Sequence, residues 1–338
     1  MALSYPAGVT SARRLLSTLA LLGGSAALDS GHAQDGFFRI GYSASAERQA
    51  PLRVTFQASA PAGYTVQWTF GDGAVASGPA ADHIYYRPGT YRLQAALLDA
   101  QGRVVSRAEA SLPVLSAGPE RAALTVLQPT PGEVRLSAEG SVLYTPARPT
   151  LLLGGREVGT VANRLPNGIY AATVRAATSD GRTAEQRLNI TVAPWTTSAP
   201  YDAEVLRLTN QARAQGWNCA SQRPGGPALP PLKLDPTLTV AAQAQSAGMS
   251  LYSYFDHTSG FDGSTPLRRV QAAGLTPTTV AENIAAGQQT PAEVVQGWLK
   301  SPGHCRNIMG DFTLIGLSYV NRPGTTYTRY WTQVFARL

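Results

Sequence analysis

The spacing of apolar residues changes near residue 195, and this change constrains the fold more than any other feature of the sequence. Before it, short β-prone runs such as 52–56 and 188–192 alternate apolar with polar residues and are separated by Gly, Pro and Asp. Such alternation predicts antiparallel sandwiches. After it, apolar residues recur at helical spacing, first in 201–215. The chain is therefore expected to place β-sandwiches first and a helix-containing domain last, with residues 195–199 as the linker.

The first 33 residues have the order of a secretory signal peptide. Arg13 and Arg14 precede the apolar run Leu15–Leu28, and the small-residue sequence Gly31-His32-Ala33 follows. The apolar run is too short to span a membrane, and no later segment is long and apolar enough. We expect residues 1–33 to be removed and the mature protein to be secreted, extracellular or periplasmic.

The basic charge does not indicate a nucleic-acid partner. The net charge is +7, but Lys233 and Lys300 are the only lysines, and the arginines are scattered along the chain. A surface that binds phosphates needs a local cluster of basic residues. We therefore expect no binding to nucleic acid.

The two cysteines are expected to pair. Cys219 and Cys305 make an even count in a chain that is expected to be exported, which favours one disulfide. The alternative is two unpaired, buried thiols.

The β-rich part contains a faint internal repeat. A Gly-x-Tyr sequence precedes a Gly-Arg pair at the same interval in two places, first Gly89-Thr90-Tyr91 with Gly102-Arg103, then Gly168-Ile169-Tyr170 with Gly181-Arg182. We expect two related modules of similar size, residues 34–116 and 117–194.

The first module resembles the PKD family of immunoglobulin-like extracellular domains. The resemblance rests on the turn sequence 68–73 (WTFGDG), on His83-Ile84-Tyr85 and on Gly89-Thr90-Tyr91. It implies a β-sandwich that serves as a spacer or adhesive module and contacts a cell-surface glycan or protein. The second module lacks these motifs, so an immunoglobulin-like sandwich is expected there from the strand pattern alone.

The last 140 residues or so carry clear helix starts. Asp235, Thr265 and Thr290 each stand directly before a proline, which is typical of an N-cap followed by the first helical residue. Glu293 stands three residues after Thr290 and completes a capping box. Strands are expected at 314–320 and 328–335. Helices mixed with a few strands predict an α+β or three-layer domain.

Residues 200–338 resemble the bacterial branch of the CAP superfamily, the SCP-like or PR-1-like secreted proteins. Four motifs carry the resemblance in order, 255–258 (FDHT), 281–287 (AENIAAG), 298–304 (WLKSPGH) and 331–335 (WTQVF). The resemblance implies an α-β-α sandwich with an open groove. The whole chain is therefore expected to be two immunoglobulin-like β-sandwiches followed by an α-β-α sandwich.

His257, Glu282 and His304 are the leading site residues. Two imidazoles and a carboxylate can hold a divalent metal such as zinc, or act as general acid and base around a water. The resemblance implies a groove tetrad of two histidines and two acids, in which His257 and His304 match the histidines, which hold metal in some members of the family, and Glu282 matches the first acid. Ser301 stands where the second acid belongs, and this departure weakens a catalytic interpretation.

The other candidates have plainer explanations. Glu282 and Asn283 suit hydrogen bonds to loop backbone as well as they suit a ligand role, and either histidine can be a buried, hydrogen-bonded side chain. Gln333 is expected at the edge of the groove. A nucleophilic Ser301 beside His304 lacks the elbow and oxyanion motifs that such a role needs.

Non-catalytic recognition is the leading functional hypothesis. The groove residues His257, Glu282, Asn283, Ser301, His304 and Gln333 would then receive a lipid, a glycan or a peptide, and His257, Glu282 and His304 could also hold a divalent metal. The alternative is a peptidase-like hydrolase in which His257 and His304 hold zinc and Glu282 activates water. A third hypothesis treats the domain as structural, with a vestigial groove, because fold analogy does not decide function.

Overall fold

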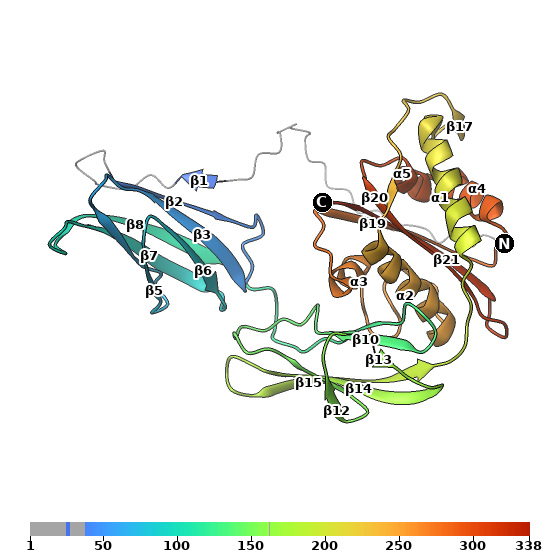
Figure 1. Ribbon diagram of the computed structural model, residues 1–338, viewed down its shortest axis with the longest axis horizontal. Helices are drawn as coiled ribbons and strands as arrows, with labels where there is room; N and C mark the ends of the chain where they lie inside the picture. The colour runs from blue at the N-terminus through green and yellow to red at the C-terminus, as the bar shows by residue number, and fades with distance from the viewer. Residues whose placement is uncertain (1–24, 28–37, 162) are drawn as a thin grey trace, which may run out of the picture. The chain divides into compact units, whose positions relative to one another are not determined.

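The computed structural model describes residues 25–27, 38–161 and 163–338 (Figure 1). They divide into two compact units, with the boundary between Leu115 and Ser116. Apart from residues 25–27, which form a short strand, the expected signal peptide lies outside the described residues.

The first unit is a β-sandwich of two four-stranded sheets, with strand orders β1-β2-β3-β6 and β5-β4-β7-β8. The strands are β1 (Ser25–Ala27), β2 (Arg39–Ala44), β3 (Leu52–Ser59), β4 (Thr65–Thr69), β5 (Val75–Ser77), β6 (Ala80–Tyr85), β7 (Gly89–Leu98) and β8 (Val104–Val114). Alternation along the end of β4 and the residue after it places Trp68 and Phe70 on one face, and both are buried with their ring centroids 6.5 Å apart. Gly71 follows at φ +83°, where an added Cβ would lie 2.6 Å from the Arg92 carbonyl oxygen. Only glycine fits this turn.

His83 has a structural role in this first unit. Its ring stacks on Phe70 with centroids 4.4 Å apart, and its Nε2 lies 2.7 Å from Oδ2 of Asp72. The histidine therefore ties β6 to the turn after β4.

The second β module is also a two-sheet sandwich, with strand orders β13-β10-β9 and β12-β11-β14-β15. Its strands are β9 (Thr125–Leu127), β10 (Glu133–Ser137), β11 (Thr150–Leu153), β12 (Arg156–Val158), β13 (Asn163–Arg164), β14 (Gly168–Ala177) and β15 (Thr183–Val192).

The faint repeat corresponds to one hairpin that occurs in both modules. The Tyr91 hydroxyl donates to the Arg87 carbonyl at 2.8 Å, and the Tyr170 hydroxyl donates in the same way to the Pro166 carbonyl at 3.0 Å. At the other end of each hairpin, Gly102 and Gly181 adopt positive φ and donate their N–H to the residue three positions earlier. The repeat therefore reflects shared geometry as well as shared letters.

The rest of the second unit is a three-layer α-β-α sandwich, as the resemblance implied. Its helices are α1 (Ala199–Ala214), α2 (Pro236–Tyr252), α3 (Pro266–Ala273), α4 (Pro291–Lys300) and α5 (Pro302–Ile308). Its strands are β16 (Trp217–Asn218), β17 (Arg223–Pro224), β18 (Lys233–Leu234), β19 (Thr279–Ala286), β20 (Leu314–Asn321) and β21 (Arg329–Arg337). The central sheet has the order β18-β20-β21-β19, so β19 forms one edge.

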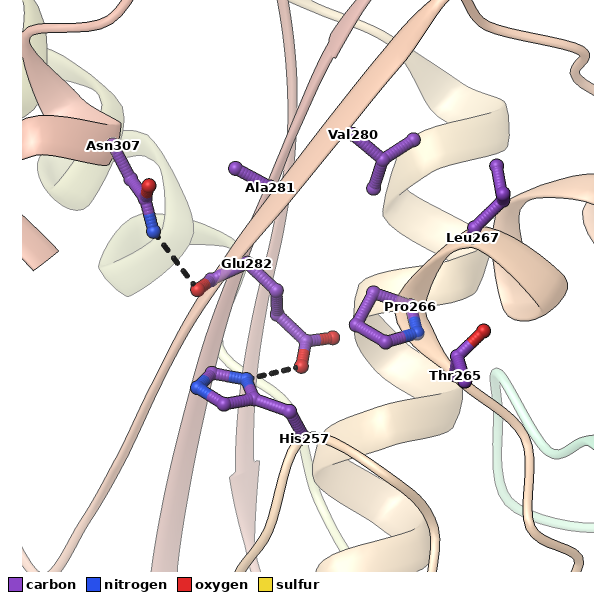
Figure 2. Close-up of a pocket in the computed structure, with 8 residues that line it drawn as sticks. All are labelled: His257, Thr265, Pro266, Leu267, Val280, Ala281, Glu282 and Asn307. Atoms are coloured by element: carbon purple, nitrogen blue, oxygen red, sulfur yellow. Dashed lines mark hydrogen bonds and ion pairs between the residues drawn. The ribbon is translucent and has the colours of Figure 1, made fainter. Parts of the chain in front are cut away.

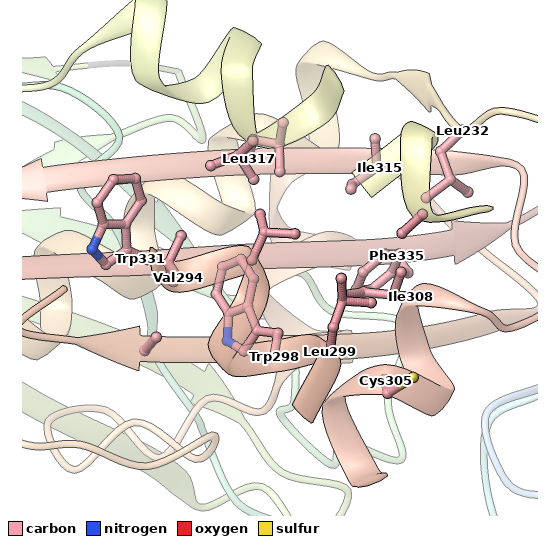
Figure 3. Close-up of a cluster of buried hydrophobic side chains, with 14 of the residues drawn as sticks. Leu232, Val294, Trp298, Leu299, Cys305, Ile308, Ile315, Leu317, Trp331 and Phe335 are labelled. Carbon is pink, nitrogen blue, oxygen red and sulfur yellow. The ribbon is translucent and has the colours of Figure 1, made fainter. Parts of the chain in front are cut away.

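Successive residues of the central strands face different helix layers. On β21, Trp331 and Phe335 join the core under α1, α4 and α5 (Figure 3), whereas Val334 joins the core under α2 and α3. On β20, Gly316 lies against α2 so closely that an added Cβ would be 2.1 Å from the Leu238 carbonyl carbon. The missing side chain therefore allows α2 to seat on the sheet.

The expected helix starts are confirmed. Asp235, Thr265 and Thr290 each accept an N–H bond from the third residue of the helix that follows. The Glu293 carboxylate reaches the N–H of Gln289, one residue before the cap, instead of the cap residue itself. The sequence did not predict β19 or α5 as regular elements.

The second β module and the α-β-α sandwich belong to one compact unit. The expected linker is itself anchored, because Trp195 is buried among residues of α2, β20 and β21, and Thr196 exchanges backbone hydrogen bonds with Asn321. Strand β9 contacts helices α2 and α3. The change in periodicity near residue 195 therefore marks a change of architecture inside a single unit.

Within the part of the chain that the structure describes, no helix combines the length and apolar character needed to cross a membrane.

Candidate functional site

The candidate site lies at the edge strand β19, where the two helix layers meet. Adjacent strand residues point to opposite faces, so Glu282 faces α3 while Asn283 faces the layer of α1 and α5. The outer edge of β19 is covered by side chains, because Trp298 of α4 and Asn307 of α5 donate to the carbonyls of Ile284 and Glu282. The strand therefore brings residues from both layers to one place.

Glu282 is a buried carboxylate with a partner on each oxygen. His257 Nδ1 lies 2.9 Å from Oε1 (Figure 2), and Arg269 Nη2 lies 2.8 Å from Oε2. The side chains of Glu282 and Arg269 are only 1% and 2% exposed, whereas that of His257 is 49% exposed. A carboxylate only accepts, so a neutral His257 must carry its proton on Nδ1, which leaves Nε2 for other contacts.

Arg269 organises the residues around this ion pair. Besides Glu282, it donates to the carbonyl of His257 at 3.0 Å and to the carbonyl of Ser264 at 2.7 Å. Arg269 therefore holds the backbone of His257 in place and also pairs with the carboxylate of Glu282. The sequence does not single out Arg269, because its arginines show no clustering, and the one available signal is that a buried acid requires a cationic partner.

His304 comes from the other helix layer, on the first turns of α5. Burial lowers the pKa of His304, and the neighbouring His257 lowers it further, so the neutral imidazole is favoured. Its carbonyl accepts a bond from the Asn283 side chain at 3.2 Å. The structure therefore bonds His257 to Glu282 and places His304 near His257, whereas a shared functional role for the three residues stays a prediction.

Two further features hold α5 in position. The Cys219–Cys305 disulfide, predicted from the cysteine count, joins α5 to the segment after α1 and closes a loop with a sequence separation of 86. Buried Arg213 on α1 donates to the carbonyls of Ile308 and Gly310 at the end of α5. The positive charge of Arg213 lies at the C-terminal, negative end of the α5 helix dipole, where it is stabilising.

Asn283 and Gln333 lie beneath the site and do not line it. Both are fully buried, and Asn283 Nδ2 donates to Gln333 Oε1 at 3.1 Å. Gln333 continues the network to Thr209 of α1 at 2.8 Å, and Asn307 donates to Asn283 Oδ1 at 2.9 Å. The expectation of Gln333 at the groove edge does not hold, because its inward strand position directs the amide into this network.

An open pocket of about 340 Å³ is centred on β19. Its lining residues are His257, Thr265, Pro266, Leu267, Val280, Ala281, Glu282 and Asn307 (Figure 2). Pro266, Leu267 and Val280 make one side of the pocket apolar, and the other side offers the imidazole of His257 and the amide of Asn307. Ser301 is not among the lining residues, since it forms the junction between α4 and α5, where its carbonyl accepts from Cys305 N–H.

The donor set does not form a ready three-ligand metal centre. Across residues 25–27, 38–161 and 163–338, no group of three or more His, Cys, Asp or Glu side chains is placed to hold a metal ion. Glu282 is committed to Arg269 and His257, which leaves the two imidazoles as candidate ligands. Zinc binding stays a prediction.

Comparisons with known proteins identify two domains. Residues 206–335 match the sequence model of CAP, the cysteine-rich secretory protein family, and residues 40–111 match that of the PKD domain. The uncharacterized protein YkwD of Bacillus subtilis (strain 168) is 40% identical over 166 residues, which cover 49% of this chain and 58% of that protein. The match thus spans little more than half the length of this relative.

Two solved structures show a weaker likeness. An outer surface protein of Borrelia burgdorferi is 20% identical, with a TM-score of 0.33, over 43% of this chain and 98% of its own. An extracellular protein containing a SCP domain from Bacillus anthracis str. Ames is 16% identical, with a TM-score of 0.34, over 88% and 86% of the two chains. Likeness at these scores carries no argument about this chain. The family matches, together with the β-sandwich and the three-layer fold, establish that the chain contains a PKD domain at residues 40–111 and a CAP domain at residues 206–335.

Proposed function

We propose that this protein is a secreted or cell-envelope recognition protein and that the pocket at β19 binds its ligand without catalysis. The observation that supports the proposal is that both carboxylate oxygens of Glu282 already have hydrogen-bond partners. A general base must reach the proton that it removes, but both oxygens of this buried carboxylate are engaged by Arg269 and His257. Both cysteines are in the disulfide, so the described residues offer no free thiol as a nucleophile.

The pocket suits a ligand that has one apolar and one polar side. Pro266, Leu267 and Val280 offer apolar contacts, whereas His257 and Asn307 offer hydrogen bonds. The volume is at the small end of the usual range for ligand sites, roughly 300–1,000 Å³. A single group of a lipid, a glycan or a peptide is therefore the expected occupant.

The expected location outside the cytoplasm is supported by two observations. The disulfide is typical of an oxidising compartment, and the family that matches residues 206–335 is described as secretory. The PKD domain would then act as a spacer or adhesive module that contacts a surface glycan or protein.

Binding is tested by NMR on the full chain, with phospholipid vesicles, chitin oligosaccharides and short peptides as separate probes. We expect one class to shift the His257 ring signals and to lose affinity about tenfold or more in Leu267→Ala, because full burial of a leucine side chain is worth about 1.5–3 kcal/mol and about 1.4 kcal/mol is a factor of ten in affinity. Leu234→Ala removes an exposed leucine of β18 and is the matched control. Turnover of any probe, or binding that Leu267→Ala leaves unchanged, would contradict the proposal.

A zinc-assisted hydrolase is the second candidate, and one observation favours it. Metal-ligating histidines commonly donate their other ring N–H to a carboxylate, and His257 stands in this relation to Glu282. His257 Nε2 and the neutral His304 ring would hold the ion, which would act as a Lewis acid. Glu282 does not fit as the base that activates water, so no catalytic step is assigned to it.

Zinc titration calorimetry on the metal-free full chain tests the metal site on which the second candidate depends. Binding at micromolar affinity that is lost in both His257→Ala and His304→Ala, but kept in His83→Gln, would support a two-histidine site. No binding by the folded parent protein would end the metal hypothesis and leave the recognition proposal standing.

A further inference from the structure

The segment between His257 and Arg269 is shared between the pocket and the second β module. We call residues 258–265 the bridging segment. It begins directly after His257 and ends at Thr265, which lines the pocket and caps α3. We propose that the second β module is a working part of the CAP pocket, because it holds the bridging segment in place and thereby positions Arg269 and His257.

The polar half of this connection runs through Asp262. This residue is buried, its Oδ2 accepts the backbone N–H of Val126 in β9 at 2.8 Å, and its Oδ1 accepts the N–H of Ser264 at 3.0 Å. The Ser264 carbonyl in turn accepts from Arg269 Nη1. An unbroken series of bonds therefore leads from β9 through Asp262 to the cation that holds Glu282.

The apolar half of the connection runs through Phe261. Its ring packs against the core of the second β module and stacks on Tyr252 of α2, with centroids 3.6 Å apart and planes within 3°. The Tyr252 hydroxyl donates to Gln128 at 2.7 Å and accepts from the Thr191 N–H at 3.2 Å. The second β module therefore contacts both the bridging segment, through Phe261, and the end of helix α2, through Tyr252.

The arrangement makes Asp262 a positioning residue for the site. Arg269 bonds the Ser264 and His257 carbonyls and the Glu282 carboxylate together, so a shift of the bridging segment changes all three bonds. The Nδ1–H bond from His257 to Glu282 then loses its support. This inference concerns the geometry of the pocket and stands whether or not the pocket binds a ligand as proposed.

The test compares Asp262→Ala with a matched carboxylate variant in the full chain. Glu120 also accepts backbone N–H bonds inside the second β module, from Tyr144 and Ser179, so Glu120→Ala removes the same kind of bond away from the bridging segment. Two signals are read by NMR at neutral pH, the ring tautomer of His257 from its ¹⁵N shifts and the amide exchange of residues 258–265. Asp262→Asn, which keeps one acceptor oxygen, serves as the conservative rescue.

We expect Asp262→Ala to abolish the uniform Nδ1–H tautomer of His257. Exchange in the bridging segment should become about ten- to a hundredfold faster, the range expected when a buried N–H loses its acceptor. Asp262→Asn should restore part of both signals, and Glu120→Ala should change neither. Unchanged tautomer and exchange in folded Asp262→Ala would overturn the inference, and so would equal effects in Glu120→Ala, since that result would indicate general destabilisation.

Discussion

At the scale of single residues, the site depends on a charge balance inside the protein. Glu282 is excluded from water, so its charge is tolerated only because Arg269 and His257 bond its two oxygens. Arg269 is the partner that is buried with Glu282, since its side chain is only 2% exposed. The pair therefore constrains the site more strongly than the histidines do.

Replacing Arg269 with methionine should destabilise the protein by about 3–5 kcal/mol, because the buried carboxylate loses its main counter-charge. Urea unfolding with a tryptophan fluorescence readout measures the loss. Arg175→Met removes the arginine of an exposed ion pair with Glu185 and should cost less than about 1 kcal/mol. Equal losses in the two variants would show that the burial of Glu282 has no energetic consequence.

A second buried acid predicts a dependence of stability on pH. Burial raises the pKa of Asp202, in the first turn of α1, to about 7, although a hydrogen bond from the Tyr319 backbone opposes the shift. The folded protein thus holds a proton that the unfolded chain releases near the ordinary pKa of 3.8. The stabilisation of the fold that comes from Asp202 is therefore fully present below pH 3.8 and is lost as the pH rises through about 7.

Asp202→Asn should therefore be more stable than the parent protein at pH 8, by a gain of up to about 4 kcal/mol, at about 1.4 kcal/mol for each of the roughly three pKa units between 3.8 and 7, and should match it near pH 3.5. Calorimetric melting across this pH range measures the difference. Glu204→Gln, an exposed change on the same helix, is the control and should show no gain at pH 8. A constant difference between Asp202→Asn and the parent at all pH values would contradict the assignment.

At the scale of elements, local signals explain part of the CAP domain. Helices α2, α3 and α4 start where a capping side chain and a proline stand together, since both act within one helical turn. Strand β19 was missed because the run 281–287 is rich in alanine and lacks the β-branched pattern of a strand. Helix α5 has 7 residues, too few for a helical period to appear.

Helix α5 is held by the disulfide and by Arg213, and these two anchors predict the effect of reduction. Reductant should loosen α5 and the His304 signal before the domain unfolds, with a stability loss of about 2–4 kcal/mol, because Arg213 and Asn283 still bond the helix. Amide exchange of residues 302–309 and circular dichroism, followed together during a reductant titration, measure the order of events. The double variant Cys219→Ser/Cys305→Ser should not respond to reductant. Simultaneous loss of both signals in the parent would contradict the prediction.

At the scale of the molecule, the second and third expected modules lie in one compact unit. The structural boundary falls between Leu115 and Ser116, and the second β module shares buried contacts with the CAP domain. A piece comprising residues 116–338 should therefore unfold at the same temperature as this unit does in the full chain.

A piece comprising residues 200–338 should have a free energy of unfolding about 3–6 kcal/mol lower than that of residues 116–338. Without the second β module, the side chains of Tyr252 and Phe261 are exposed to water, at a cost of about 1.5–3 kcal/mol each. Differential scanning calorimetry of the two pieces measures the loss. Equal transitions in both would show that the second β module is an independent attachment.

The sequence by itself determined what a few neighbouring residues encode. The Trp68 turn, the paired hairpins, the capped helix starts and the family motifs that contain His257, Glu282 and His304 all depend on local chemistry, and the even cysteine count gave the disulfide. Only the tertiary structure decided that Arg269 neutralises Glu282, that Gln333 is buried, and that Asp262 bonds Val126 across 136 residues of chain. Such partners depend on how separate layers dock, and a buried charge or N–H accepts whichever group the docking brings within reach.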